Sequence, residues 1–338
     1  MKLNYKTYNL PFKYPFTISK GTKTQQPSLV VELEYFGFKG YGEAPAISYY
    51  NIPLEKMVAD LEAKKMFVEK FSFSDPERYW HYLHHLFPQN SFLVCALDLA
   101  GWDLYGKMKR KQLHELWNLD LNNAPLTDFT IGLDSIETMV KKMKEKPWPI
   151  YKIKVGAEDD IEMVTALRNE TDALFRVDAN GGWTLEQALH KIPQLKELGV
   201  EFIEQPLAKD NWDGMKILYK ESVLPLIADE SCVGETDILS CIDHFHGINI
   251  KLTKCSGITP AKRMIQKARE LNMLVMVGCM NESSLGTAAI AQLAPLLDYV
   301  DMDGPLLLTE DIAAGVGFDH GKIIYREGYG LGVEMKDF

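Results

Sequence analysis

Charged side chains recur where the apolar runs of this sequence end. Amines or carboxylates occupy such positions at Lys154, Asp178, Glu204, Asp229 and Lys251. Neighbouring members of this series are separated by 22 to 26 residues, which is about the length of one strand, one helix and two short loops. Because parallel strands of a β/α barrel end at one face, the spacing predicts that these side chains share one barrel mouth.

The three carboxylates of the series predict a metal site. Asp178, Glu204 and Asp229 would come from successive strands and converge on one side of the mouth. Such close carboxylates raise one another's pKa unless a cation lies between them. An all-oxygen ligand set suits Mg²⁺. The alternative, unrelated loop acids paired with local lysines, would have to place three acids at matching strand ends by chance.

The lysines predict proton transfer beside that ion. Lys152 and Lys154 are two strand positions apart and therefore point to the same face. Two ammonium groups beside a divalent ion should have a lowered pKa, toward the range of a general base. Lys251 should lie across the mouth from Lys154. Two opposed amines can remove a proton from one face of a carbon and return it to the other, as in a racemase or epimerase acting through a metal-stabilised enolate.

The elements that must position these residues alternate from about residue 125. Segments whose apolar residues recur every three or four positions are predicted to be helices, and they separate eight candidate strands. Strands separated by helices should run parallel and close into a barrel. The strands are predicted at 128–133, 150–155, 174–178, 200–204, 225–229, 247–251, 273–278 and 298–303. Before them, residues 1 to about 45 alternate apolar and polar side chains over 28–35 and then carry three glycines, which indicates a β-meander. Helices are predicted at 54–67, 75–86 and 91–107.

Composition favours a small-molecule enzyme. The 338 residues are 46% hydrophobic and carry a net charge of −10, which disfavours binding to nucleic acid or to an anionic membrane. The sequence has no run of about 20 apolar residues and no secretion signal at its start, so we expect a cytoplasmic protein. Five cysteines without a CxxC pair indicate reduced thiols. Cys279 stands out because it follows a predicted strand and should face the mouth.

Six motifs and one helix resemble the enolase superfamily, muconate-lactonizing-like subgroup, and within it the dipeptide epimerases. The helix is Ala96 to Lys107, and the motifs are Lys152-Ile-Lys154, Val177-Asp-Ala-Asn-Gly-Gly-Trp183, Phe202-Ile-Glu-Gln-Pro206, Ile227-Ala-Asp-Glu-Ser231, Ile248-Asn-Ile-Lys-Leu252 and Gly278-Cys-Met-Asn-Glu-Ser283. The resemblance implies an α/β fold, a (β/α)7β TIM-like barrel over 121–307. It also implies an α+β capping domain over 1–120, completed by about 308–338.

The resemblance also implies roles for particular residues. One Mg²⁺ per subunit would be bound by the three carboxylates, and Lys152 would help to hold the substrate carboxylate. Asp301 and Asp303, on the eighth strand, match an Asp-x-Asp that binds the ammonium group of a dipeptide. Thr130 and Cys279 match positions that line the dipeptide.

The second residue of the dipeptide should be recognised by the loop over 17–24. Epimerases for dipeptides of alanine and glutamate carry an arginine there, and here Lys20 and Lys23 stand near that place. A lysine keeps the positive charge of an arginine but cannot make its two parallel hydrogen bonds to one carboxylate. The alternative is that both lysines are solvated loop residues with no role in substrate binding.

The implied activity is epimerization at the α-carbon of the carboxyl-terminal residue, from L-Ala-D-Glu to L-Ala-L-Glu, in murein peptide metabolism. The same scaffold also carries epimerases of other dipeptides, N-acylamino acid racemase, o-succinylbenzoate synthase and muconate-type cycloisomerase. These last three have no need for paired acids on the eighth strand. A binding barrel without activity is the non-enzyme alternative. The sequence does not determine the oligomeric state, and a homo-oligomer is one of the alternatives.

Overall fold

Eight parallel strands form the centre of the molecule. The computed structural model describes residues 1–338 except 19–20 and 157–158. The strands are hydrogen-bonded in chain order. They are β4 (Phe129–Ile131), β5 (Ile150–Lys154), β6 (Leu174–Asp178), β7 (Val200–Glu204), β8 (Leu226–Ala228), β9 (Gly247–Ile250), β10 (Leu274–Gly278) and β11 (Tyr299–Asp301). A parallel bridge between Thr127 and Val300 brings the first and last strands together. The predicted barrel is therefore confirmed as a nearly closed sheet.

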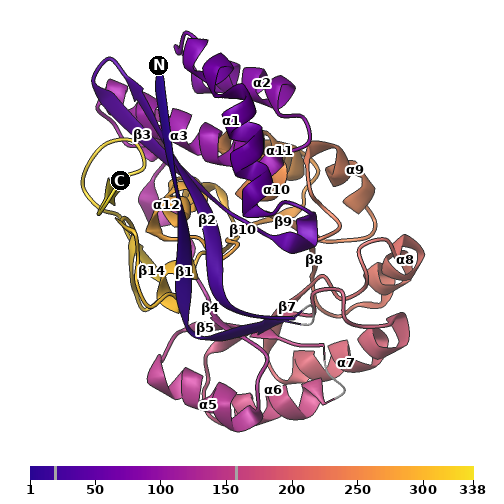
Figure 1. Ribbon diagram of the computed structural model, residues 1–338. Helices are drawn as coiled ribbons and strands as arrows, with labels where there is room; N and C mark the ends of the chain where they lie inside the picture. The colour runs from indigo at the N-terminus through magenta and orange to yellow at the C-terminus, as the bar shows by residue number, and fades with distance from the viewer. Residues whose placement is uncertain (19–20, 157–158) are drawn as a thin grey trace.

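Helices cover the outside of the barrel, and polar side chains fix where several of them begin. Ser135, Thr184, Asn211 and Ser283 each accept a hydrogen bond from a backbone N–H in the first turn, which satisfies one of the donors that a helix start leaves free. Figure 1 shows α5 to α8 following one another around the strands. The bounds are α5 (Ile136–Glu145), α6 (Asp160–Arg168), α7 (Leu185–Glu197), α8 (Trp212–Glu221), α9 (Ile238–Cys241), α10 (Leu252–Cys255), α11 (Ile258–Glu270), α12 (Ser284–Leu293) and α13 (Gly304–Leu307).

An antiparallel sheet and three long helices cap the barrel. The sheet has the order β1 (Lys2–Ile18), β2 (Gly21–Tyr35) and β3 (Phe38–Pro45), and the helices are α1 (Leu54–Lys70), α2 (Pro76–Leu86) and α3 (Ser91–Lys109). The long β1–β2 hairpin crosses the front of the barrel in Figure 1. Gly42 allows β3 to lie directly on α3, because a Cβ there would be 2.0 Å from the carbonyl oxygen of Ala96.

Buried carboxylates join the cap to the barrel. Glu43 on β3 accepts hydrogen bonds from Ser283 and from the Gly286 N–H, at the start of α12. Asp98 on α3 accepts from the Thr259 N–H at 3.0 Å and from the Thr259 hydroxyl at 2.7 Å, in the first turn of α11. These bonds set the orientation of the cap above the strand ends.

The carboxyl-terminal segment closes over both parts of the molecule. It contains the short strands β12 (Ala313–Ala314), β13 (Gly317–Asp319), β14 (Lys322–Ile324) and β15 (Glu334–Met335). The Leu113 N–H donates to the Gly330 carbonyl, and the Leu331 N–H donates to Asp103 on α3. The Thr127 N–H, just before β4, donates to the Gly321 carbonyl. The exact boundaries of the two domains stay a prediction.

Short 3-10 helices complete the connections. They are η1 (Ser48–Tyr50), η2 (Leu121–Asn123), η3 (Glu235–Asp237) and η4 (Ala294–Leu296), with α4 (Leu113–Leu116) as a single α-helical turn. None of the helices in the described residues is both long and apolar enough to cross a membrane.

Candidate active site at the barrel mouth

A cavity of about 250 Å³ lies between the carboxyl ends of the strands and the cap. Its floor includes Lys154, Asp229 and Lys251 from the barrel. The described part of its roof comes from two segments of the cap. These roof residues are Phe16, Ile18, Gly21, Thr22, Lys23, Ile47, Tyr49 and Tyr50. The cavity therefore joins charged strand ends to a mixed, largely apolar roof, as is usual for a site that binds a small molecule.

Lys152 lies beneath this cavity at the centre of a buried ionic cluster. Its ammonium nitrogen is 2.8 Å from Glu204, 2.8 Å from Asp301 and 3.2 Å from Asp178. Only 1% of the residue is exposed, and it is not among the residues that line the cavity. Its contact with a substrate carboxylate stays a prediction.

The acids around Lys152 and Lys251 set the direction of the pKa shifts of these two lysines. The lowering of the lysine pKa beside a bound divalent ion stays a prediction. Burial does act in that direction on Lys152, but Asp301, Glu204 and Asp178 outweigh it and raise its pKa. Burial likewise lowers the pKa of Lys251, and Asp229 more than reverses the effect. Sequence spacing showed the neighbouring amines but not how closely the acids would approach them.

Lys154 and Lys251 face each other across the mouth. Lys154 ends β5 and Lys251 follows β9, and these strands are four positions apart in the eight-stranded barrel. Lys154 donates a hydrogen bond of 2.6 Å to Asp178. Lys251 donates at 3.0 Å to the Cys279 carbonyl and lies 3.7 Å from Asp229. Both ammonium groups line the cavity from opposite strands, as predicted from the sequence.

The three predicted metal ligands come from the strands between these two lysines. Asp178 and Glu204 end β6 and β7, and Asp229 follows β8 directly. Burial, and then the charge of Asp178, raises the pKa of Glu204 to about 7. Burial has the same tendency at Asp229, but Lys251 and Lys254 overcome it and lower the pKa of this carboxyl. The acids come from adjacent strands on one side of the mouth, and Lys152 lies between Asp178 and Glu204.

Two supporting residues of this cluster were not predicted. Lys254 is fully buried and donates to the Asp229 carboxylate at 2.6 Å and to the Cys232 carbonyl at 2.9 Å. Asn249 donates to Glu204 at 2.8 Å. Asn249 precedes Lys251 by two strand positions, so the alternation of strand side chains could have revealed it. Lys254 lies in a helical turn after the strand, and nothing in its spacing indicated its contact.

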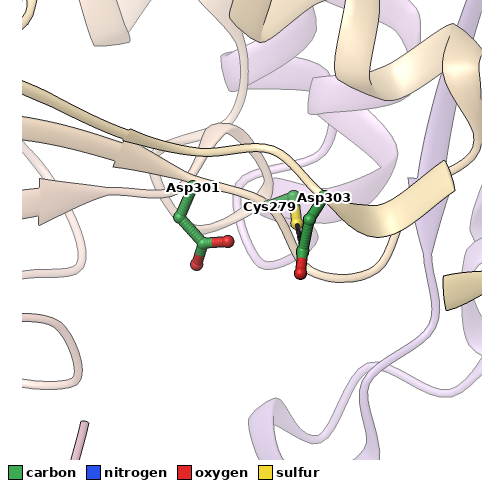
Figure 2. Close-up of side chains that lie close together, drawn as sticks. All are labelled: Cys279, Asp301 and Asp303. Atoms are coloured by element: carbon green, nitrogen blue, oxygen red, sulfur yellow. Dashed lines mark hydrogen bonds between the residues drawn. The ribbon is translucent and has the colours of Figure 1, made fainter. Parts of the chain in front are cut away.

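The predicted acid pair lies with Thr130 and Cys279, but only Asp301 belongs to the eighth strand, because β11 ends there and Asp303 directly precedes α13. Asp303 accepts a 2.6 Å hydrogen bond from the Thr130 N–H, and the Cys279 thiol donates to Asp303 at 3.8 Å. Figure 2 shows Asp301, Asp303 and Cys279 side by side. Burial, and then Asp301, raises the pKa of Asp303 to about 7. Lys152 overcomes the effect of burial on Asp301 and lowers its pKa to about 2.

Of the two lysines predicted in the loop over 17–24, only Lys23 can be placed, and it lies on the strand β2 and not in a loop, because its segment pairs with the end of β1. It lines the cavity and donates to the Gln26 side chain at 3.3 Å, and burial lowers its pKa. Lys20 lies outside the described residues.

Comparison with protein families matches nearly the whole chain. Residues 3–117 match the mandelate racemase / muconate lactonizing enzyme N-terminal domain. Residues 135–338 match the enolase C-terminal domain-like family.

Individual relatives are similar over the same length. The chain is 52% identical to the L-Ala-D/L-amino acid epimerase of Flavobacterium johnsoniae, covering 99% of this chain and 100% of the relative. It is 38% identical to the L-Ala-D/L-Glu epimerase of Bacteroides thetaiotaomicron, covering 98% and 88%. The dipeptide epimerase of Cytophaga hutchinsonii, solved with Mg and D-Ala-L-Val, superposes with a TM-score of 0.92 at 26% identity, covering 99% and 96%. The chain therefore belongs to the enolase superfamily, and within it to the dipeptide epimerases.

Proposed function

We propose that this isomerase interconverts L-Ala-D-Glu and L-Ala-L-Glu in a Mg²⁺-dependent reaction, in murein peptide metabolism. The observation that carries the proposal is the placement of Lys154 and Lys251 on strands four positions apart, with both amines lining one cavity. An α-carbon held between them has one amine on each face. One lysine would remove the α-proton and the other would return a proton from the opposite side, which inverts the centre.

Asp178, Glu204 and Asp229 would hold the Mg²⁺. Their ligand atoms are all oxygen, which suits this ion. In the described residues, these three carboxylates do not all bring an oxygen within 4.8 Å of one another. Asp178 and Glu204 both contact Lys152, and Asp229 contacts Lys254. Sharing an ion therefore requires their oxygens to move closer together. When bound, Mg²⁺ supplies positive charge that stabilises the negative charge developing on the substrate carboxylate.

Asp301 and Asp303 would bind the free ammonium group of the dipeptide. Both line the cavity and are nearly fully buried. The Thr130 N–H holds one oxygen of Asp303, and Asp301 Oδ1 has no hydrogen-bond partner. A buried oxygen without a partner is costly unless a ligand satisfies it. An N-acylated amino acid has no ammonium group, so this pair favours a dipeptide over a substrate of N-acylamino acid racemase.

Lys23 would meet the glutamate side chain. It lies on β2 at the cavity roof, where burial makes a carboxylate partner more valuable than at the surface. A lysine cannot make the two parallel hydrogen bonds of an arginine, so we expect a preference for the acidic side chain without strict selection.

A second candidate is a broader set of L-alanyl dipeptides. Around Lys23 the roof presents Phe16, Ile18 and Ile47, and such apolar walls can also accept an uncharged side chain. The name of the Flavobacterium johnsoniae relative agrees with this wider range.

Proton exchange at the α-carbon in deuterated water tests the function directly. We expect Mg²⁺-dependent exchange and inversion with L-Ala-D-Glu, detected by proton NMR. In Asp303→Asn, kcat/KM for free dipeptides should fall by about 10- to 100-fold, because a charge-assisted contact contributes about 1.5 to 3 kcal/mol.

The N-acetylated dipeptide is the matched control for the ammonium contact. Its poor turnover should change little between wild type and Asp303→Asn. Faster turnover of the acetylated form than of the free dipeptide would exclude an ammonium role for the paired aspartates.

A further inference from the structure

Cys279, Asp301 and Asp303 form a cluster with the donor set of a metal site. One donor atom of each residue lies within 4.8 Å of the others, and no other group of three such side chains in the described parts of the chain meets this spacing. All three are at least nine-tenths buried: Cys279 is 6% exposed, Asp301 4% and Asp303 1%. The predicted Mg²⁺ ligands are a separate set on other strands.

In each of the two aspartates, Oδ2 makes a hydrogen bond outside the cluster and Oδ1 is left for a ligand within it. Asp301 uses Oδ2 in its 2.8 Å contact with Lys152, while its Oδ1 is buried without a hydrogen-bond partner. Asp303 uses Oδ2 to accept from the Thr130 N–H, and its Oδ1 lies 3.8 Å from the Cys279 sulfur. Figure 2 shows the thiol beside Asp303, with the Asp301 carboxylate next to this pair.

The thiol determines which cation this cluster prefers. Sulfur is a soft ligand that selects Zn²⁺ or Cd²⁺, whereas Mg²⁺ prefers oxygen alone. Tetrahedral bonds of about 2.3 Å to sulfur and about 2.0 Å to oxygen place neighbouring donors roughly 3.5 Å apart. The donors of the cluster lie within 4.8 Å, so rotations of three side chains close the remaining gap. Because all three residues line the cavity, an ion can enter through the same opening as the substrate.

We propose that Cys279, Asp301 and Asp303 form an inhibitory site for Zn²⁺ and similar soft divalent cations. The Cys279 thiol releases its proton to water, the thiolate binds the ion, and the ion occupies the position of the substrate ammonium group. Its competition with the dipeptide rests on the proposed function, whereas its binding to the three side chains does not. Lys152, which contacts Asp301 as well as Asp178 and Glu204, separates this ion from the predicted Mg²⁺ position.

Cd²⁺ binding to the Mg²⁺-supplemented protein tests the site without any turnover. Thiolate ligation to Cd²⁺ gives an ultraviolet charge-transfer band, and we expect one equivalent of this band in wild type. Cys279→Ser should remove the band, and Asp303→Asn should weaken Cd²⁺ binding by at least about tenfold, the low end of losses seen even for residues beside metal ligands. Cys255→Ser is the matched control, because Cys255 is also buried yet donates only to backbone carbonyls. It should keep the band.

Inhibition by Zn²⁺ supplies the second readout. We expect Zn²⁺ to inhibit competitively with the dipeptide, with inhibition persisting when Mg²⁺ is raised tenfold and weakened in Cys279→Ser. Inhibition that Mg²⁺ relieves, or that is equal in wild type and Cys279→Ser, would place the ion on the other acids and overturn the proposal. An unchanged Cd²⁺ band in Cys279→Ser would do the same. If no dipeptide is turned over while the Cys279-dependent band is present, the proposed function fails and the metal site stands.

Discussion

Four buried lysines at the strand ends, Lys152, Lys154, Lys251 and Lys254, each have a carboxylate partner, and each of the three predicted metal ligands contacts at least one of them. Asp178 contacts both Lys152 and Lys154, and Asp229 contacts Lys254 as well as lying near Lys251. Removing one member of a buried pair is usually costly because it leaves a charge without compensation. Here Asp178 and Asp229 each have a second amine nearby, so the loss of one lysine leaves neither carboxylate without a positive charge beside it. Each proton-transfer lysine can therefore be removed while its acid keeps a second amine.

We expect Lys154→Ala and Lys251→Ala each to retain the fold and to lose epimerization. The loss should be at least about 10²- to 10⁴-fold in kcat, the usual contribution of a positioned acid or base. Circular dichroism and the melting temperature check the fold, and NMR of the α-proton checks the reaction. Lys141→Ala is the control, because Lys141 is exposed on the outer helix α5. Near-normal inversion in either active-site variant would contradict the two-base mechanism.

The positions of the charged residues were predictable because parallel strands end at one face and their side chains alternate. Asp178 and Glu204 end their strands as predicted, and Lys152 and Lys154 point to the same cluster. The contacts of Lys152 and Lys251 with the surrounding acids were not predictable, because they depend on distances of a few ångströms between side chains from different strands.

Some side chains cap the start of a helix that lies elsewhere in the sequence, and these contacts hold the elements together. Asp98 on α3 does this for α11, and Trp102, one turn later on α3, donates to the same Thr259 hydroxyl at 2.8 Å. Burial raises the pKa of Asp98 from 3.8 to about 7. The folded protein therefore binds a proton here that the unfolded chain releases at lower pH.

This difference predicts a pH dependence of stability. A carboxyl whose pKa is higher in the folded state stabilises the protein fully below about pH 3.8 and loses this contribution as pH rises toward 7. The difference in unfolding free energy between wild type and Asp98→Asn should therefore fall with rising pH in that range, by up to about 1.4 kcal/mol per pH unit.

Denaturant titrations of both proteins at several pH values measure this difference. Other buried acids such as Glu43 are present in both proteins, so their contributions cancel. A difference that is independent of pH would show that Asp98 is ionised in the folded protein.

Hydrophobic periodicity predicted the longer elements and missed others for physical reasons. All eight barrel strands are confirmed, and β6 and β7 have the predicted bounds. The 17-residue β1 lies within the predicted β-meander, but its bounds were not predicted, because many of its side chains are exposed and polar and hide the alternation. The helices α9, α10 and α13 have four residues each, which is too short to show a helical period.

At the scale of the whole molecule, the carboxyl-terminal segment links the cap to the barrel. Gln112 donates to the Arg326 carbonyl, Leu113 N–H donates to Gly330, and Asp103 accepts from both Tyr41 and Leu331. Leu331 and Val333 are also buried in the main core. The segment therefore belongs to the cooperative structure, although its sequence is rich in glycine.

Deleting residues 312–338 should destabilise the entire protein rather than release a separate part. It exposes apolar core surface and leaves buried groups of α3 and α4 without partners, each costing about 1 to 3 kcal/mol. Thermal unfolding should show a strongly lowered midpoint, or a chain that does not fold. Removal of Phe338 alone, which is 40% exposed, is the control. An unchanged midpoint in the longer deletion would contradict this role.

The hydrogen bond between the Thr130 N–H and Asp303 joins residues 173 positions apart. Thr130 lies on the first strand of the barrel and Asp303 follows the last. The bond can therefore form only when the two ends of the barrel meet, so this part of the binding site is completed by the folding of the whole barrel and by no local segment.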